Sequence, residues 1–348
     1  MLESHRMEYE PDASYTLFGT EALLKRLQAL TQEIGGVRQA EDIEYIHRMR
    51  VASRRLRSAL ALFQDTLPRK KFADWDNQVK RITRALGVAR DTDVQIAALD
   101  ECLRTLPELR FKSGIERLRL RLQQRRQLLQ AKVLKALDDW EAGAIGEEMS
   151  QSLRQTLVQA RLNQVEAVSP LVFQRAYSNI SLRLEEFLSY ESCVRRPEQI
   201  AELHAMRIAA KRLRYTVEIF APLYEDELKE PLKAVREAQE MLGDIHDCDV
   251  WAQYLPEFME QERARALEYM GHARSFGRLA TGLVYFQQNR RQRRDQRYRD
   301  FVGFWEQAQT LAVWSQLRQS LQSHLTPAEP PPAEPPPAPS SPPMEALA

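Results

Sequence analysis

A histidine and several arginines recur at fixed spacing in two segments of the chain. Residues 41–63 read EDIEYIHRMRVASRRLRSALALF, and residues 198–220 read EQIAELHAMRIAAKRLRYTVEIF, so an offset of 157 residues relates the two segments. Ten of the 23 aligned positions are identical, and both segments keep the pattern His-x-x-Arg-x-x-x-[Arg/Lys]-Arg-x-Arg. Imidazole and guanidinium groups suit phosphate binding, because they donate charge-assisted hydrogen bonds to its oxygens.

The pattern predicts a basic stripe on an amphipathic helix in each segment. At about 100° per residue, four basic side chains of the first segment share a sector of about 80° beside an apolar face. These are His47, Arg50, Arg54 and Arg57, with counterparts His204, Arg207, Lys211 and Arg214. Arg55 and Arg212 lie off the stripe but are also duplicated. Because like charges repel one another and few acidic residues interrupt the stripes, a bound anion is the natural explanation, although solvated arginines and salt bridges are the alternative.

Basic residues repeated on other predicted helices are expected to enlarge this phosphate-binding surface. Two such stripes facing each other across a pseudo-twofold axis would form a long basic groove or tunnel, which suits a linear polyanion. The additional residues are Arg26 and Arg183, Lys80 and Arg236, Arg125 and Arg126, and Arg290 and Arg291. The last two come from an arginine cluster between 290 and 299, whose other members we expect to be solvated.

Two further matches support an internal duplication. LGVARDTDV (86–94) matches LGDIHDCDV (242–250) at an offset of 156, and a weaker match at 165 aligns the arginines near 125 with those near 290. We expect each DxDV sequence to cap the start of a helix or to orient nearby arginines. Its carboxylates, with His246 and Cys248, leave a metal site as the alternative; no metal site is predicted.

Composition and periodicity predict an all-α fold. Only 12 glycines occur in 348 residues, and ten of the 18 prolines fall in the last 23 residues. The prediction is two tandem, pseudo-twofold-related bundles of about four helices each, followed by a disordered Pro-rich tail over 326–348. The bundles cover about 15–140 and 171–310, with a linking helix near 147–168.

The expected helices follow the apolar spacing. In the first bundle they cover about 17–35, 41–65, 70–86 and 110–140. In the second they cover about 171–190, 198–220, 226–242 and 258–310, the last broken by the glycines near 271–282.

Several classes of protein are excluded by composition. Lysine plus arginine (50) nearly balances aspartate plus glutamate (49), so the net charge of +1 does not by itself indicate a charged partner. No apolar run is long enough to span a bilayer, and the first residues do not resemble a signal peptide, so a cytoplasmic protein without a membrane partner is expected. The three scattered cysteines suit a reducing compartment.

These residues resemble the CHAD domain, the conserved histidine α-helical domain. The doubled HxxRxxxRRxR helix, the LGxxxDxDV segment and the two-bundle layout carry the resemblance over most of 15–310. The resemblance implies a cytoplasmic protein that binds inorganic polyphosphate through the basic groove. It also implies association with polyphosphate granules, where granule proteins would be further partners. Some relatives add a CYTH-type triphosphatase domain, but no ExExK strand is present here, so that activity is not expected. Lys211 departs from the arginine of the pattern, and the Pro-rich tail is not part of it.

The resulting prediction is non-enzymatic polyphosphate binding with no cofactor and no catalytic residue. One alternative is a phosphohydrolase or phosphotransferase that uses His47 and His204 on polyphosphate or a triphosphate. Another is a generic polyanion binder. Nucleic acid is not expected to be the main ligand, because aromatic residues that would stack on bases are scarce beside the stripes. The tail is a spacer or a partner ligand.

Overall fold

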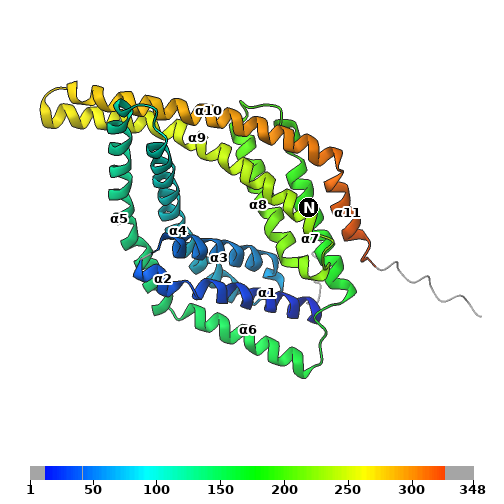
Figure 1. The fold of residues 1–348 in the computed structure, drawn as a ribbon. Helices are drawn as coiled ribbons and strands as arrows, with labels where there is room; N and C mark the ends of the chain where they lie inside the picture. The colour runs from blue at the N-terminus through cyan, green and yellow to red at the C-terminus, as the bar shows by residue number, and fades with distance from the viewer. Residues whose placement is uncertain (1–11, 41, 326–348) are drawn as a thin grey trace, which may run out of the picture.

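The chain is all-α within residues 12–40 and 42–325, which the computed structural model describes (Figure 1). The helices are α1 (Ala13–Thr31), α2 (Ile34–Gln39), α3 (Ile43–Leu62), α4 (Arg69–Arg104), α5 (Lys112–Ala142), α6 (Ile145–Leu162), α7 (Pro170–Leu188), α8 (Ile200–Phe220), α9 (Lys229–Met270), α10 (Arg274–Thr310) and α11 (Val313–Gln322). Short 3-10 turns include η1 (Gln64–Thr66) and η2 (Leu109–Phe111). The predicted disordered tail, 326–348, lies outside the described residues.

The two halves of the chain repeat one helical pattern. Helices α1, α3, α4 and α5 correspond to α7, α8, α9 and α10, and α6 connects the halves while packing along α1 (Figure 1). Every buried position of α3 has a buried counterpart 157 residues later on α8. A shift of one residue would rotate these side chains off the core face, so the match fixes the register of the duplication.

The third helix of each half is longer than the sequence predicted. The prediction ended these helices at 86 and 242, whereas α4 continues to Arg104 and α9 to Met270. The predicted ends fall on Leu86 and Leu242, each followed by a glycine, but Gly87 and Gly243 lie inside α4 and α9. The break in the last predicted helix occurs at Gly271, whose φ of 69° is the left-handed conformation typical of a helix C-terminus.

Side-chain caps define the start of the motif helix α3 and of the first helix in each half. Asp42 accepts a hydrogen bond from a backbone N–H in the first turn of α3. Asp12 and Ser169 do the same for α1 and α7, and Pro170 begins α7 at a position where a missing N–H costs nothing. The helix of the first basic stripe therefore begins at a capped residue, whereas Gln199 at the start of α8 makes no side-chain cap hydrogen bond.

Two apolar clusters stabilise the fold. The central cluster joins α1, α3, α7 and α8 with the nearer ends of the long hairpins α4–α5 and α9–α10. The tip cluster lies where the far ends of these hairpins meet (Figure 1). There a Cβ on Gly114 would lie 2.1 Å from the Leu279 carbonyl oxygen, and a Cβ on Gly282 would lie 2.0 Å from the Phe111 carbonyl oxygen. This reciprocal contact is what a pseudo-twofold axis produces.

Candidate functional site

A groove of about 960 Å³ lies between the two halves, along the motif helices α3 and α8. Because α3 and α8 each bury one face in the central cluster, the basic stripe beside that face is left at the surface of the groove. Further lining residues come from α4 and α7. Three residues of the first stripe (Arg50, Arg54 and Arg57) and two of the second (Arg207 and Lys211) line this groove.

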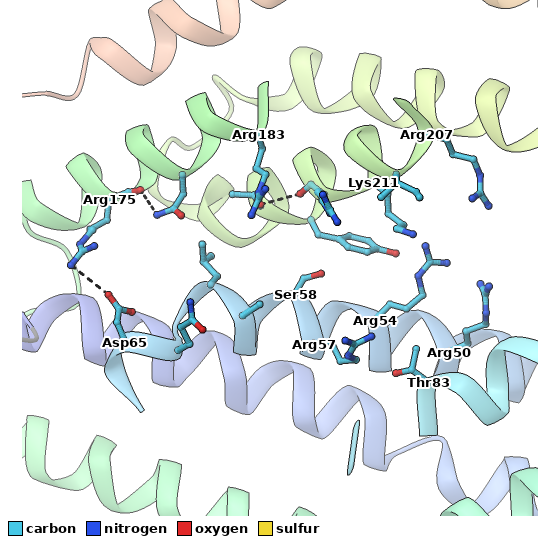
Figure 2. Close-up of a pocket in the computed structure, with 18 of the residues that line it drawn as sticks. Arg50, Arg54, Arg57, Ser58, Asp65, Thr83, Arg175, Arg183, Arg207 and Lys211 are labelled. Atoms are coloured by element: carbon cyan, nitrogen blue, oxygen red, sulfur yellow. Dashed lines mark hydrogen bonds and ion pairs between the residues drawn. The ribbon is translucent and has the colours of Figure 1, made fainter. Parts of the chain in front are cut away.

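The lining of this groove is strongly basic. Asp65 is the one carboxylate among the described residues that line it. The eight basic residues are Arg50, Arg54, Arg57, Arg175, Arg183, Arg207, Lys211 and Arg212. In Figure 2, Arg50 and Arg54 extend from α3 toward Arg207 and Lys211 of α8. These parts of the two stripes face each other, so positive charge is concentrated between α3 and α8.

Some groove cations have carboxylate partners and others do not. Arg50 Nη2 lies 3.1 Å from Asp91 Oδ1, and Arg57 Nε lies 3.2 Å from Asp76 Oδ1. Arg54, Arg207 and Lys211 form no salt bridge with any carboxylate of the described chain; these three carry the uncompensated charge at the centre of the groove. A bound anion would supply the missing counter-charge.

Burial and mutual repulsion perturb these central cations. Burial, followed by the charges of Arg54 and Arg207, lowers the pKa of Lys211 to about 7. Burial likewise lowers the pKa of the Arg54 guanidinium, which lies 5.9 Å from the centre of the Tyr215 ring. Removing cations from water disfavours their charged form, so the groove cations are electrostatically strained in the direction that an anion would relieve.

The motif histidines lie beside the groove and are not part of its lining. His204 Nδ1 is 3.0 Å from His246 Nδ1, and burial and the charge of Arg207 lower the pKa of His204. Burial, followed by the charge of Arg90, lowers the pKa of His47. Arg90 occupies in the first half the position of His246 in the second, so a basic group faces each motif histidine.

Four of the predicted basic residues gather on the opposite side of α3 and α8 around one carboxylate. Glu218 lies 3.0 Å from Arg55 Nη2, 2.9 Å from Arg214 Nε and 3.2 Å from Arg236 Nη2. Arg26 interacts electrostatically with the same glutamate. This role of Glu218 was not predicted from the sequence, although the residue lies four positions after Arg214 of the second stripe.

The remaining predicted residues lie outside the groove. Lys80 lines a separate hollow between α4 and α6. Arg126 Nε is 2.7 Å from Asp93 Oδ1, a buried pair, and Arg125 precedes it on α5. Arg290 lies over the Phe286 ring, and Arg291, beside it on α10, is likewise absent from the groove lining.

The DxDV sequences do not cap helices, because both lie inside long helices. The alternative that their carboxylates orient arginines is confirmed: Asp93 pairs with Arg126, and Asp249 pairs with Arg294 Nε at 2.5 Å. These equivalent pairs show that α5 and α10 correspond at an offset of 168, and the offset of 165 taken from the arginine doublets is wrong. Arg294, expected to be solvated, is mostly buried.

Neither a three-ligand metal cluster nor a membrane-spanning helix occurs among the described residues. No three His, Cys, Asp or Glu side chains gather there in a way that could hold a metal ion. None of the described helices combines the length and hydrophobicity that a membrane span requires. Cys102, Cys193 and Cys248 are buried free thiols.

Solved structures share this fold. The crystal structure of the CHAD domain from the plant Ricinus communis is 25% identical and matches 79% of this chain and 93% of its own, with a TM-score of 0.57. PptA from Streptomyces chartreusis matches 84% of this chain and 99% of its own with a TM-score of 0.54, at 16% identity.

Sequence relatives and a family model complete the comparison. Uncharacterised proteins of Mycobacterium tuberculosis strains CDC 1551 / Oshkosh and ATCC 25618 / H37Rv are each 25% identical over 233 residues. The match covers 62% of this chain and 41% of each relative, so the chain spans under half of their length. The CHAD domain model matches residues 21–256, which is more than half of the chain. The chain belongs to the CHAD domain family.

Proposed function

We propose that this protein binds inorganic polyphosphate in the groove between its two halves. The observation that carries the proposal is the groove lining, which among the described residues holds eight lysine and arginine side chains and one carboxylate. Guanidinium groups bind phosphate oxygens through paired hydrogen bonds, and several such groups along one groove suit a chain of repeated phosphates.

The form of the groove favours a linear polyanion over a single phosphate. Its basic residues extend from Arg50 and Arg207 at one end, past Arg54 and Lys211, to Arg183 toward the other (Figure 2). The aromatic residues in the described lining are Tyr15 and Tyr215. Proteins that bind single-stranded nucleic acid stack successive bases on aromatic rings, so this lining suits a ligand without bases.

We propose binding without turnover. Basic groups face His47 and His204, and the one lining carboxylate, Asp65, pairs with Arg175 at 3.5 Å. This arrangement favours holding an anion over activating a nucleophile, which needs a base and an orienting acceptor. The cellular counterpart of this proposal is a cytoplasmic protein associated with polyphosphate granules.

The test is a binding titration with polyphosphate of graded chain length. Sub-micromolar affinity for long chains corresponds to about 8 kcal/mol or more. Affinity should fall steeply with salt, because cation–phosphate contacts release counterions. Duplex DNA at equal phosphate concentration serves as the competitor, and phosphate release with magnesium is assayed in parallel.

Two double variants with reversed charge, one in the groove and one on α5, test whether the groove is the binding site. Arg54→Glu with Lys211→Glu places two acidic groups between the stripes and should abolish binding. Lys132→Glu with Lys135→Glu makes the same charge change on the exposed face of α5 and should retain binding. Failure of the wild type to bind polyphosphate would refute the proposal, as would equal affinity of the two double variants.

A further inference from the structure

The pseudo-twofold axis gives the open groove a counterpart on the opposite side of α3 and α8. At the offset of 157, Arg57 of the groove corresponds to Arg214, and Arg212 corresponds to Arg55. Arg183 likewise corresponds to Arg26. The counterpart therefore carries the same three guanidinium groups on equivalent helices, and the matching buried positions of α1 with α7 and α3 with α8 confirm that register.

The counterpart side already contains an anion. The Glu218 side chain is 10% exposed, and Arg55 contacts it from the other half of the molecule. Burial acts to raise its pKa, but the hydrogen bond from Arg214 and the charges of Arg55 and Arg214 outweigh burial and lower the pKa. Glu218 is therefore an ionised oxyanion held by arginines of both halves.

In the open groove, alanine replaces this glutamate. Ala61 is the equivalent of Glu218, is exposed, and lines the groove. Two of the arginines around it pair with Glu186, which is not part of the groove lining. Arg183 Nη1 lies 2.7 Å from Glu186 Oε2, and Arg212 contacts the same carboxylate. A guanidinium has five N–H donors, so one lateral carboxylate leaves donors for a ligand.

The exchange of acid and alanine is reciprocal. Glu186 on α7 corresponds to Ala29 on α1, so the open side has its glutamate beside the arginines and alanine at the centre. The counterpart side has alanine beside them and Glu218 at the centre. The same cationic frame is thus filled on one side and vacant on the other.

We propose that the Glu218 carboxylate substitutes permanently for a phosphate group, and that the vacant frame over Ala61, formed by Arg57, Arg183 and Arg212, is the equivalent phosphate subsite of the open groove. The inference rests on the proposed polyphosphate-binding function and adds the position of one bound phosphate. Figure 2 shows Arg57 and Arg183 entering the groove from opposite walls, as a subsite between the halves requires. It also explains why the frame over Ala61 is open and the frame around Glu218 is filled.

The first test fills the vacant subsite. Ala61→Glu restores the side chain of the counterpart position, so its carboxylate should pair with the surrounding arginines and displace the ligand. We expect polyphosphate affinity to fall about tenfold or more, because charge-assisted contacts are lost and a negative charge is added. Ala131→Glu is the matched control, because it makes the same substitution at an exposed position on α5, away from the groove. Equal affinity of these two variants would overturn the proposed subsite.

The second test empties the filled subsite and uses inorganic phosphate alone as the probe. Glu218→Ala should lower the thermal unfolding temperature, and phosphate should raise it by more degrees than in the wild type, because the anion replaces the lost carboxylate. Glu218→Ser also removes the bulk of the side chain and is the second variant if Glu218→Ala folds poorly. Equal phosphate effects in the wild type and in the variant that folds would contradict the role of Glu218 as a phosphate substitute.

The two tests separate this inference from the proposed function. Stabilisation of the Glu218 variants by phosphate does not depend on polyphosphate binding by the wild type. If the wild type binds polyphosphate and Ala61→Glu binds equally well, the function stands and the subsite is refuted. If the wild type does not bind polyphosphate, the proposed function fails, whatever the phosphate effect on the Glu218 variants.

Discussion

The two halves of the protein meet at two junctions of opposite character. At the tip, α5 and α10 approach closely enough for glycine to contact backbone, and the surrounding side chains are apolar. Phe111 stacks on Tyr285 with ring centres 4.3 Å apart, and Trp251 packs edge-on against Phe286 at 5.0 Å. At the centre, the groove faces of α3 and α8 present arginines and a lysine to each other.

The difference indicates that the tip junction contributes stability and that the central junction is suited to ligand binding. Like charges facing one another across the groove repel, so the halves depend on other contacts, in the central apolar cluster and at the tip, to stay together. The tip provides such contacts through buried apolar area and close backbone packing, which do not depend on the ligand. We expect changes at the tip to alter stability and changes at the centre to alter binding.

Among substitutions at the two junctions, Gly282→Ala should cause the largest loss of stability. Its Cβ would lie 2.0 Å from the Phe111 carbonyl oxygen, which is backbone and cannot rotate away, so α5 and α10 must separate. We expect a loss of about 3 kcal/mol in the free energy of unfolding, measured by chemical denaturation.

Gly277→Ala is the control on the same helix. Nothing lies within 4 Å of a Cβ at this exposed position. Because alanine favours a helix over glycine, this variant should gain up to about 1 kcal/mol. Similar stability of the two variants would show that the tip contact does not hold the halves together.

A smaller loss of stability is expected at the boundary between the two apolar clusters. The buried pair of Asp249 and Arg294 lies there in the second half, as that of Asp93 and Arg126 does in the first. Arg294→Met leaves Asp249 buried without its partner. Burial already raises the pKa of Asp249, so the carboxyl can take up a proton, which limits the expected loss to about 2 kcal/mol.

An exposed arginine of the same helix provides the comparison for this pair. Arg297 Nε lies 2.9 Å from Asp244 Oδ2, with both side chains about 40% exposed. Arg297→Met should change the free energy of unfolding by less than about 1 kcal/mol, because solvent screens this pair. Equal losses for the two variants would mean that the pair at Asp249 does not connect the two clusters.

Sequence alone predicted the features that depend on local periodicity. The duplication, the all-α fold and the facing of each basic stripe follow from helical spacing, because position on a helix is set by residue number. The boundaries of most helices agree within a few residues for the same reason. The third helices are the exception: Gly87 suggested a helix end, and the tertiary packing of α4 against α5 carries the helix onward.

Sequence could not predict which cations would already have partners. Arg55 and Arg212 occupy equivalent positions, yet Arg212 lines the groove and Arg55 pairs with Glu218. That distinction depends on Glu218 and its counterpart Ala61, whose effect appears only when α3 and α8 are packed together. The offset of 165 failed for a similar reason, since runs of arginine match one another in several registers and the partner aspartate decides among them.

The smallest expected effect is the dependence of polyphosphate affinity on pH that Lys211 causes. It should appear at the central junction and not at the tip. Burial and the neighbouring arginines lower the pKa of Lys211 to about 7, and polyphosphate would raise it by supplying negative charge. Below about pH 7 the free protein already carries the proton, so this lysine adds no pH dependence. Above that value binding must take up a proton, so affinity should fall by up to about tenfold per pH unit, or about 1.4 kcal/mol, until the pKa of the bound state is reached.

Calorimetric titrations at pH 8, in two buffers of different ionisation enthalpy, measure this proton uptake directly. Lys211→Arg should bind without it, because arginine stays protonated and restores the residue of the repeated pattern. Gly282→Ala, assayed where it is folded, should keep the wild-type uptake, because its substitution leaves the groove cations unchanged. If Lys211→Arg takes up as many protons as the wild type, the coupling belongs to another group, and the central junction does not sense the ligand through this lysine.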